Sequence, residues 1–241
     1  MKLTVIGCFG AYPEPDGATS GYLLEADGTR ILVDCGSGVL ARLQTVLPLP
    51  ALDALVVSHY HPDHDADLGC LHHAAMIDML LRRRSTPLAA WGPDGLDRLT
   101  YGEYCTGDSY LPELSFDIGA FHVEAHANIH EIPSYALRFT AGGKALVYSG
   151  DTGYDEALAD FARGADLFLC ESSFYAAQAA IAKDMHLTSA QTGILAQKAG
   201  VGQLLLTHFP HFGDIKQLRA EASEQYTGDL MLAARGMQIT I

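Results

Sequence analysis

The chain has 241 residues, 49% of them apolar, and carries 15 lysines and arginines against 29 aspartates and glutamates, for a formal net charge of −14. This length and composition are typical of a globular protein that buries a substantial core. The acidic balance disfavours an extended contact with RNA or DNA, because such contacts need a basic face that neutralises phosphates. No apolar run approaches the roughly 20 residues of a membrane helix, so no membrane partner is expected.

The five cysteines, at positions 8, 35, 70, 105 and 170, are scattered and include no C-x-x-C pair. This spacing argues against a disulfide framework and against a zinc ribbon, and it suits a reducing compartment. The apolar run near Met1 is too short for a signal peptide and is interpreted as a first strand. We therefore expect a cytoplasmic protein that forms one domain over residues 1–241.

Apolar runs with strand character recur along the whole chain. Strands are predicted at Leu3–Gly7, Tyr22–Glu25, Arg30–Asp34, Ala54–Val57, Leu88–Trp91, Phe121–Ala125, Tyr135–Phe139, Ala145–Tyr148, Leu167–Cys170, Gln203–Thr207 and Met237–Ile241. Helices are predicted at Ser37–Val46, Asp65–Arg83, Pro93–Thr100, Tyr154–Arg163, Ser189–Ala199 and Asp214–Gln225.

Turn and capping signals support this order of elements. The glycines of ADGT (26–29) and AGGK (141–144) favour tight hairpin turns. Thr188–Gln191 has a capping-box pattern that begins the fifth helix. Each half of the chain starts with a hairpin and then alternates strands with helices. This pattern predicts an α/β sandwich of two similar halves, with sheets inside and helices outside.

Imidazole and carboxylate side chains lie next to several predicted strands. They are His59, His61, Asp63, His64, His130, Asp151, Glu171 and His208. If the sheets run in register, the strand ends converge on one rim, where ligands bind in α/β folds. Imidazole and carboxylate are ligands that zinc accepts. The five histidines and two aspartates of this set are too many for one tetrahedral ion and suit two ions that share a carboxylate and activate a hydroxide.

The stretch SHYHPDHDADLG at residues 58–69 has a spacing with a steric meaning. The rings of His59 and His61 project the same way from an extended segment, so they could chelate one ion. Asp63 and His64 lie beyond Pro62, where the chain must turn, so they can face a second ion. The alternative is a solvated loop that precedes the next helix, but an H-x-H-x-D-H pattern directly after a strand favours the metal site.

These residues resemble the signature of the metallo-β-lactamase superfamily. The H-x-H-x-D-H motif, the earlier ILVDCG (31–36), SGDT (149–152) and LTHF (206–209) occur in the order typical of that superfamily, so the resemblance covers essentially the whole chain. It implies an αββα four-layer sandwich, with two mixed β-sheets flanked by helices, and a site for two Zn²⁺ ions, with Mn²⁺ or Fe²⁺ as alternatives.

The resemblance also implies roles for individual residues. One metal would be held by His59, His61 and His130, the other by Asp63, His64 and His208, and Asp151 would bridge the two. Asp34 would lie behind the ligands and orient the site, as metal ligands generally require. His126 could replace His130 as a ligand, although only His130 has the Pro-x-Tyr context.

Within the superfamily, HEIPSYALR (130–138), HLTSAQ (186–191) and LLLTHF (204–209) look like the ribonuclease Z group of phosphodiesterases. This resemblance implies that His186 meets the scissile phosphate without binding metal, that Glu171 is the acid of a strand-end motif, and that the protein forms a homodimer. Two departures count against processing of folded tRNA. The segment PEPDGATSGY (13–22) is acidic where that group has a basic loop. Only twenty positions separate His130 from Asp151, which leaves no room for an inserted arm.

The predicted catalytic residues are His186, Asp63 and Glu171. Asp63 would orient a metal-activated hydroxide, and His186 would stabilise the phosphoryl oxygens or donate a proton to the leaving oxygen. Glu171 either holds His186 in the required tautomer or is only the neighbour of a helix N-cap. His211 either lines the mouth of the pocket or lies on a surface loop.

The sequence therefore predicts a dinuclear zinc phosphodiesterase similar to ribonuclease Z. Its expected substrate is a small phosphodiester such as a cyclic nucleotide, or a short single-stranded RNA. Because the metal cage does not itself specify phosphorus, a hydrolase of lactones or thioesters is one alternative. A metal-binding regulatory protein with incidental hydrolysis is another.

Overall fold

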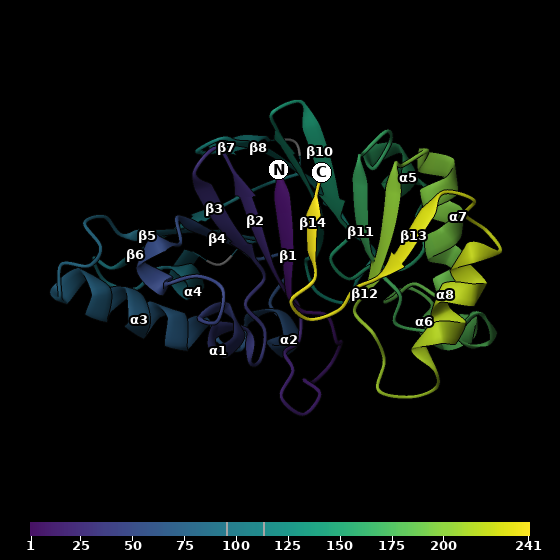
Figure 1. Cartoon of the computed structure of the whole chain (residues 1–241), viewed down its shortest axis with the longest axis horizontal. Coiled ribbons are helices and arrows are strands. Elements are labelled where there is room, and N and C mark those ends of the chain that lie inside the picture. Colours follow the sequence, from purple (N-terminus) through teal and green to yellow (C-terminus); the bar gives the residue numbers. More distant parts are fainter. Residues whose placement is uncertain (95, 113) are drawn as a thin grey trace.

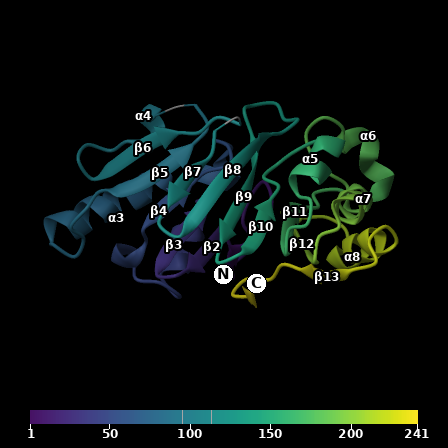
Figure 2. The same cartoon turned by 90° about the horizontal axis from the view of Figure 1, so that it is seen from above.

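The computed structural model describes residues 1–94, 96–112 and 114–241. Two seven-stranded sheets pack face to face, and helices cover their outer faces (Figures 1 and 2). The N- and C-termini lie side by side, because strand β14 (Gln238–Thr240) pairs with strand β1 (Lys2–Gly7) (Figure 1). No helix in the described ranges is long and apolar enough to cross a membrane.

The remaining elements are as follows. The first sheet continues with β2 (Gly21–Ala26), β3 (Thr29–Val33), β4 (Ala54–Val56), β5 (Leu88–Gly92) and β6 (Cys105–Ser109). The second sheet contains β7 (Phe116–Ile118), β8 (Phe121–Ala127), β9 (Tyr135–Ala141), β10 (Lys144–Tyr148), β11 (Leu167–Glu171), β12 (Gln203–Thr207) and β13 (Asp229–Leu232). The helices are α1 (Val39–Leu43), α2 (Pro62–Asp65), α3 (Leu68–Leu80), α4 (Leu96–Leu99), α5 (Glu156–Phe161), α6 (Ala179–Ala182), α7 (Ser189–Ala199) and α8 (Ile215–Ser223), with 3₁₀ turns at Leu49–Ala51 and Ala176–Gln178.

The two sheets share one pairing pattern, as the predicted two similar halves require. The first sheet has the order β14-β1-β2-β3-β4-β5-β6, and the second has the order β7-β8-β9-β10-β11-β12-β13. Read in these orders, the first four strands of each sheet are antiparallel neighbours, and the last four are parallel neighbours. This arrangement confirms the predicted αββα sandwich.

The apolar side chains alternate along the strands between two cores. Along β2, Tyr22 and Leu24 belong to the core that includes the second sheet, and Leu23 belongs to the core under helices α1 and α3. Along β3, Ile31 points to the first of these cores and Leu32 to the second. Because successive side chains of a strand point to opposite faces, a strand buried on both faces becomes apolar throughout. The continuous apolar runs noted in the sequence have this cause.

Every strand predicted from the sequence is present, and the ends differ by at most two residues. Both predicted hairpin turns are confirmed: the central residues Asp27, Gly28, Gly142 and Gly143 all have positive φ. The capping box at Thr188 is also confirmed. Three strands, β6, β7 and β13, were not predicted.

The helix predicted over Asp65–Arg83 is present as α3, Leu68–Leu80, but it is shorter at both ends, and Asp65 belongs to the separate helix α2. The chain forms α2 and then α3, and Asp67 lies at the break between them. The Asp67 amide donates to Cys35 O at 3.0 Å, and its carboxylate accepts from the Leu40 amide at 2.9 Å, so this residue joins the helix break to the segment after β3. Of the helix predicted at Pro93–Thr100, α4 covers Leu96–Leu99, and Gly95 lies outside the described residues.

Candidate metal centre

The predicted ligands come from strand ends and short connections that meet at one rim of the sandwich. His59 and His61 follow β4, Asp63 and His64 lie in α2, and His130 lies between β8 and β9. His208 directly follows β12, and Asp151 lies three residues beyond the end of β10; both strands are neighbours of β11 in the second sheet.

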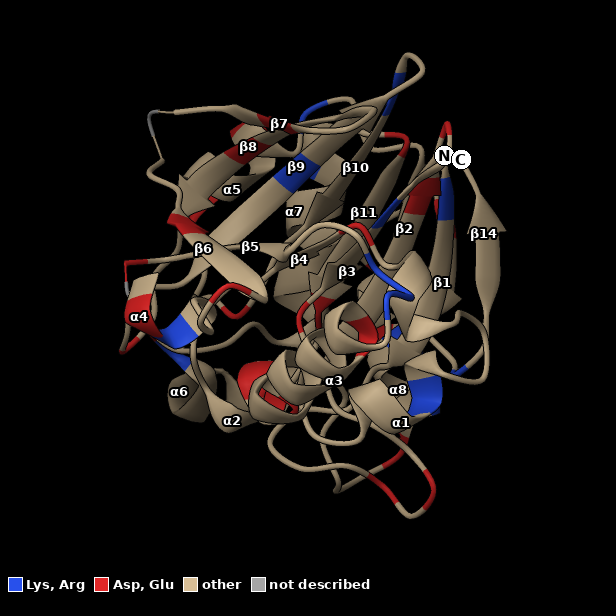
Figure 3. Ribbon diagram, turned by 90° about the vertical axis from the view of Figure 1, so that its left-hand side faces the viewer, with Lys and Arg blue, Asp and Glu red and all other residues tan. Residues whose placement is uncertain are grey.

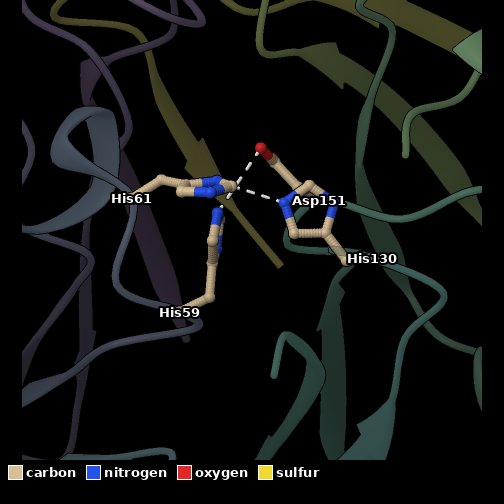
Figure 4. Close-up of side chains that lie close together, drawn as sticks. All are labelled: His59, His61, His130 and Asp151. Atoms are coloured by element: carbon tan, nitrogen blue, oxygen red, sulfur yellow. Dashed lines mark hydrogen bonds and ion pairs between the residues drawn. The ribbon is translucent and has the colours of Figure 1, made fainter. Parts of the chain in front are cut away.

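One group of potential ligand atoms comes from His59, His61, His130 and Asp151, all within 4.8 Å of one another (Figure 4). His61 Nδ1 lies 3.1 Å from His130 Nε2, and His59 Nε2 lies 3.6 Å from Asp151 Oδ2. The two rings of the H-x-H pair therefore face the same point, as their spacing predicted.

A second group comes from Asp63, His64, Asp151 and His208, and all four residues are buried. Asp151 Oδ2 lies 3.3 Å from His64 Nε2 and 3.4 Å from His208 Nε2. Asp63 Oδ2 lies 3.1 Å from the same His208 nitrogen. Because Asp151 belongs to both groups, a single buried carboxylate connects the two candidate ion positions.

The donor atoms fit a divalent cation. His59 Nε2 and Asp151 Oδ1 are buried and have no hydrogen-bond partner among the described residues. Leaving such atoms unpaired costs free energy, and a metal ion at the centre of the cluster would satisfy both. Imidazole nitrogen with carboxylate oxygen is a donor set that zinc and neighbouring divalent metals accept.

Asp34 holds one side of the cluster from behind. This carboxylate is fully buried and accepts hydrogen bonds from His64 Nδ1 at 2.7 Å, the Ser58 amide at 2.7 Å, the Ser58 hydroxyl at 2.9 Å and the Tyr148 hydroxyl at 2.8 Å. Since the Ser58 hydroxyl donates to Asp34, it accepts from His59 Nδ1, 3.1 Å away. Both rings therefore present Nε2 to the cluster, which fixes the tautomer needed for metal binding.

Glu171 holds the other side in the same way. Its buried carboxylate accepts from the Ser173 hydroxyl, from the Thr152 amide at 2.7 Å and from His186 Nδ1 at 3.2 Å. Because Ser173 donates to Glu171, its oxygen accepts from His208 Nδ1 at 2.8 Å. Glu171 thus contacts His186 directly, which is the contact that the orienting role requires.

His186 lies at the edge of the cluster. Its ring stacks on His208 with centroids 5.6 Å apart, and its Nδ1 is 3.9 Å from Asp151 Oδ2. Burial acts to lower the pKa of His186, but the carboxylates of Glu171 and Asp151 outweigh it and raise this pKa to about 9. His186 is therefore protonated near neutral pH in the absence of other cations.

Protons and metal compete for the cluster. Burial acts to lower the pKa of His64, but the carboxylates of Asp151 and Asp34 raise it well above its usual value. The same negative charge attracts divalent cations, which must displace the proton in order to bind.

The two remaining histidines of interest have different surroundings. His126 is outside the cluster: its ring stacks on Phe161, and its Nε2 lies 3.6 Å from Asp155 Oδ2. The structure thus brings His130, and not His126, to the cluster. His211 lines a cavity of about 420 Å³ that opens beside the cluster, so the interpretation of His211 as part of the pocket agrees with the structure.

Gly10 packs against the ring of His208. A Cβ atom at residue 10 would lie 2.5 Å from His208 Cε1, closer than atoms can approach. We expect Gly10→Ala to displace this ring and to weaken metal binding about 10- to 100-fold, as loss of support behind a ligand does. Metal titration against a chromogenic chelator measures this effect. Gly69→Ala is the matched control, because nothing lies within 4 Å of that position. Equal affinities in both variants would contradict the prediction.

Two mixed sheets in this order, with a histidine and aspartate cluster at their common rim, define a protein of the metallo-β-lactamase fold. The sequence profile described as a beta-lactamase superfamily domain matches residues 29–209. The chain is 40% identical to the probable metallo-hydrolase YhfI of Bacillus subtilis (strain 168) over 240 residues, which cover 98% of each protein. The chain therefore belongs to the beta-lactamase superfamily.

Two solved structures and one further sequence relative agree with this assignment. The crystal structure of the metallo-beta-lactamase fold protein YhfI superposes with a TM-score of 0.96 and 38% identity, covering 99% of this chain and 98% of that one. Human tRNase Z, short form, superposes with a TM-score of 0.79 and 25% identity over 100% and 99% of the two chains. Ribonuclease Z of Salinispora arenicola is 26% identical over an alignment of 296 positions, gaps included, which covers 100% of this chain and 96% of that protein.

Proposed function

We propose that this protein is a dinuclear zinc hydrolase that cleaves phosphodiesters in the manner of ribonuclease Z. The observation that carries the proposal is the shared carboxylate: Asp151 belongs to both groups of potential ligands, and His186 stands at the edge of the second. Whole-length similarity to proteins named ribonuclease Z and tRNase Z supports the choice of a phosphodiester.

Two divalent ions bound by these groups would acidify a water molecule and offset the charge of the phosphoryl group. The chain supplies the rest of the chemistry. Asp63 accepts a hydrogen bond from the Ala11 amide at 2.7 Å, which fixes the carboxylate at the wall of the cavity. His186 donates its Nδ1–H to Glu171 and leaves Nε2 for the cavity, where it can protonate the leaving oxygen.

A small substrate suits the charge of the surface and of the cavity. Lysines and arginines are dispersed over separate elements on the face shown in Figure 3, with no continuous basic band. Among the described residues that line the cavity, none is Lys or Arg. These observations support a small phosphodiester or a short single-stranded RNA over a folded nucleic acid. A cytoplasmic location and a homodimer complete the proposal; they rest on the cysteine pattern and on the sequence resemblance.

The cation-free wall of the cavity is also compatible with an uncharged substrate, so a lactone or thioester hydrolase is the second candidate. One experiment separates the two. The purified protein is analysed for metal and assayed with bis(p-nitrophenyl) phosphate beside a panel of lactones and thioesters. We expect about two equivalents of zinc and turnover of the phosphodiester that a chelator abolishes and Zn²⁺ or Mn²⁺ restores.

The other outcomes are equally informative. Turnover of lactones or thioesters without turnover of the phosphodiester would replace the proposal with the second candidate. Turnover of every substrate no faster than that of a His64→Ala variant would indicate a metal-binding regulatory protein.

A further inference from the structure

We propose that the cavity beside the metal cluster contains a nucleobase-binding platform, formed by Tyr12 stacked on His211. The substrate would then be a diester of a nucleoside monophosphate, with its phosphate at the metals and its base on the Tyr12 ring. This inference rests on the proposed phosphodiesterase function and adds a specificity-determining subsite to it.

Two loops that are distant in sequence build the platform. The segment after β1 and the segment after β12 form a parallel bridge between Phe9 and Phe209. The Gly10 amide donates to Phe209 O at 3.0 Å, and the Phe209 amide donates to Cys8 O at 2.9 Å. These bonds make the chain before Tyr12 run alongside the chain from His208 towards His211.

Three aromatic rings stack where these loops reach the cavity. His211 lies between Phe9 and Tyr12: its centroid is 5.1 Å from that of Phe9 and 3.7 Å from that of Tyr12, and the planes of Tyr12 and His211 differ by 8°. His211 Nε2–H also donates to the Tyr12 carbonyl oxygen, which holds the two rings in register. Tyr12 ends the stack and is 57% exposed, so its outer face can accept another flat ring.

The platform is fixed relative to the metal ligands. The residue before Tyr12, Ala11, donates its amide to the Asp63 carboxylate, and the ligand His208 lies three residues before His211. A substrate whose phosphate binds at the cluster therefore meets the Tyr12 ring at a constant offset. Such a fixed arrangement is what a specificity subsite needs.

Phe174 and Phe212 add apolar surface to the lining of the same cavity. Their ring centroids are 6.1 Å apart, and Phe174 also approaches the His186 ring at 5.8 Å. The cavity volume, about 420 Å³, falls in the range of sites for small organic ligands. Several aromatic rings in one cavity lining favour a flat, weakly polar group such as a base, because every base offers a π face.

The charged residues of the cavity limit the number of phosphate groups that the substrate can carry. Among the described lining residues there is no Lys or Arg, and the rim carries the Glu131 carboxylate, 60% exposed and 3.1 Å from His61 Nε2. A phosphate beyond the one at the metals would meet a carboxylate and no cation. The substrate class that fits is therefore a nucleoside monophosphate diester, cyclic or open, and not a nucleoside polyphosphate.

The test compares two esters that release the same p-nitrophenolate: the p-nitrophenyl ester of thymidine 5′-monophosphate and methyl p-nitrophenyl phosphate. We expect the zinc-loaded protein to prefer the thymidine ester in kcat/KM by about 5- to 150-fold, the range for one stacked base. Tyr12→Ala and Tyr12→Leu should remove most of this preference, and Tyr12→Phe, which keeps the ring, should retain it.

A second measurement does not depend on turnover. Equilibrium dialysis of thymidine 5′-monophosphate and of methyl phosphate against the same holoproteins should show the same preference and the same loss. Leu80→Ala, an exposed apolar residue of α3 outside the cavity lining, is the control for surface changes. A preference that persists in both Tyr12→Ala and Tyr12→Leu, or a parent protein that treats both esters alike, would overturn the platform. Failure to cleave either ester would instead reject the proposed phosphodiesterase function.

Discussion

Replacement of His186 by alanine is expected to lower kcat for a phosphodiester by about 10²- to 10⁴-fold and to leave the metal content unchanged. In the proposed mechanism His186 is the proton donor at the cavity wall, while the two groups of candidate ligands that share Asp151 do not include it. Metal analysis and steady-state kinetics on the same preparation measure both quantities. Glu171, His186 and His208 also bring ligand atoms within 4.8 Å of one another, so loss of one metal in this variant would identify His186 as a ligand and contradict the assignment.

The pH profile gives the same assignment an independent readout. Burial acts to lower the pKa of His186, and the carboxylates of Glu171 and Asp151 raise it to about 9. A proton donor is active below its pKa and inactive above it, so kcat should fall on the alkaline side. Divalent cations bound nearby would lower the pKa of His186 again. We therefore expect the alkaline fall of kcat in the parent protein at a pH below 9. Glu171→Gln removes one of the carboxylate charges and should move the limb to still lower pH. An alkaline limb that stays in place would exclude His186 as the donor.

The three strands that the sequence did not predict all lie at sheet edges. β6 ends the first sheet, and β7 and β13 end the second. An edge strand has one neighbour and often one solvated face, so it needs neither a continuous apolar run nor strict alternation. The polar sequence CTGDS of β6 shows this: only Cys105 is buried. Interior strands are covered on both faces, so they appear in the sequence as continuous apolar runs and can be predicted from it.

The residues of the candidate site also differ in how well the sequence predicts them. The candidate ligands were predictable as one set because several of them follow predicted strands, whose ends meet at one rim, whereas their division into two metal sites was implied by the family resemblance. The residues that orient them were less accessible to prediction. Ser173 lies between Glu171 and His208, and Ser58 lies between Asp34 and His59, but a lone serine has no periodicity or spacing that reveals such a contact. These contacts depend on which loops meet after folding.

The stacked pair of Tyr12 and His211 is a further case of this kind. The two residues are 199 positions apart in the sequence, and no local pattern connects them. Residues 13–22 contain two acidic side chains and no Lys or Arg, but no sequence pattern marks the aromatic residue that precedes them. The charge of the loop argues against a folded nucleic acid as substrate, whereas the proposed base-binding platform follows only from the tertiary contact.

Asp151→Ala is expected to reduce the zinc content from about two equivalents to one or fewer and to lower kcat by at least about 10³-fold. Two cations roughly 3.5–4 Å apart repel each other strongly, and a shared carboxylate offsets that repulsion. Asp151 is the residue common to both ligand groups, and it is 2% exposed, so solvent cannot replace its charge. Metal analysis after dialysis against graded chelator concentrations, together with kinetics, measures the two effects.

Two further variants separate charge from geometry. Asp151→Asn keeps the shape of the side chain and one potential ligand oxygen but not its charge, so we expect it to retain one ion more readily than the alanine variant while remaining nearly inactive. Asp160→Ala, at a solvent-exposed aspartate of α5, changes the net charge by the same amount outside the cluster and should retain both ions. If Asp151→Ala kept two equivalents and an activity within tenfold of the parent, Asp151 would not be a shared ligand. The two groups of side chains would then have to act as independent sites, and a mechanism that needs two adjacent ions would lose its structural basis.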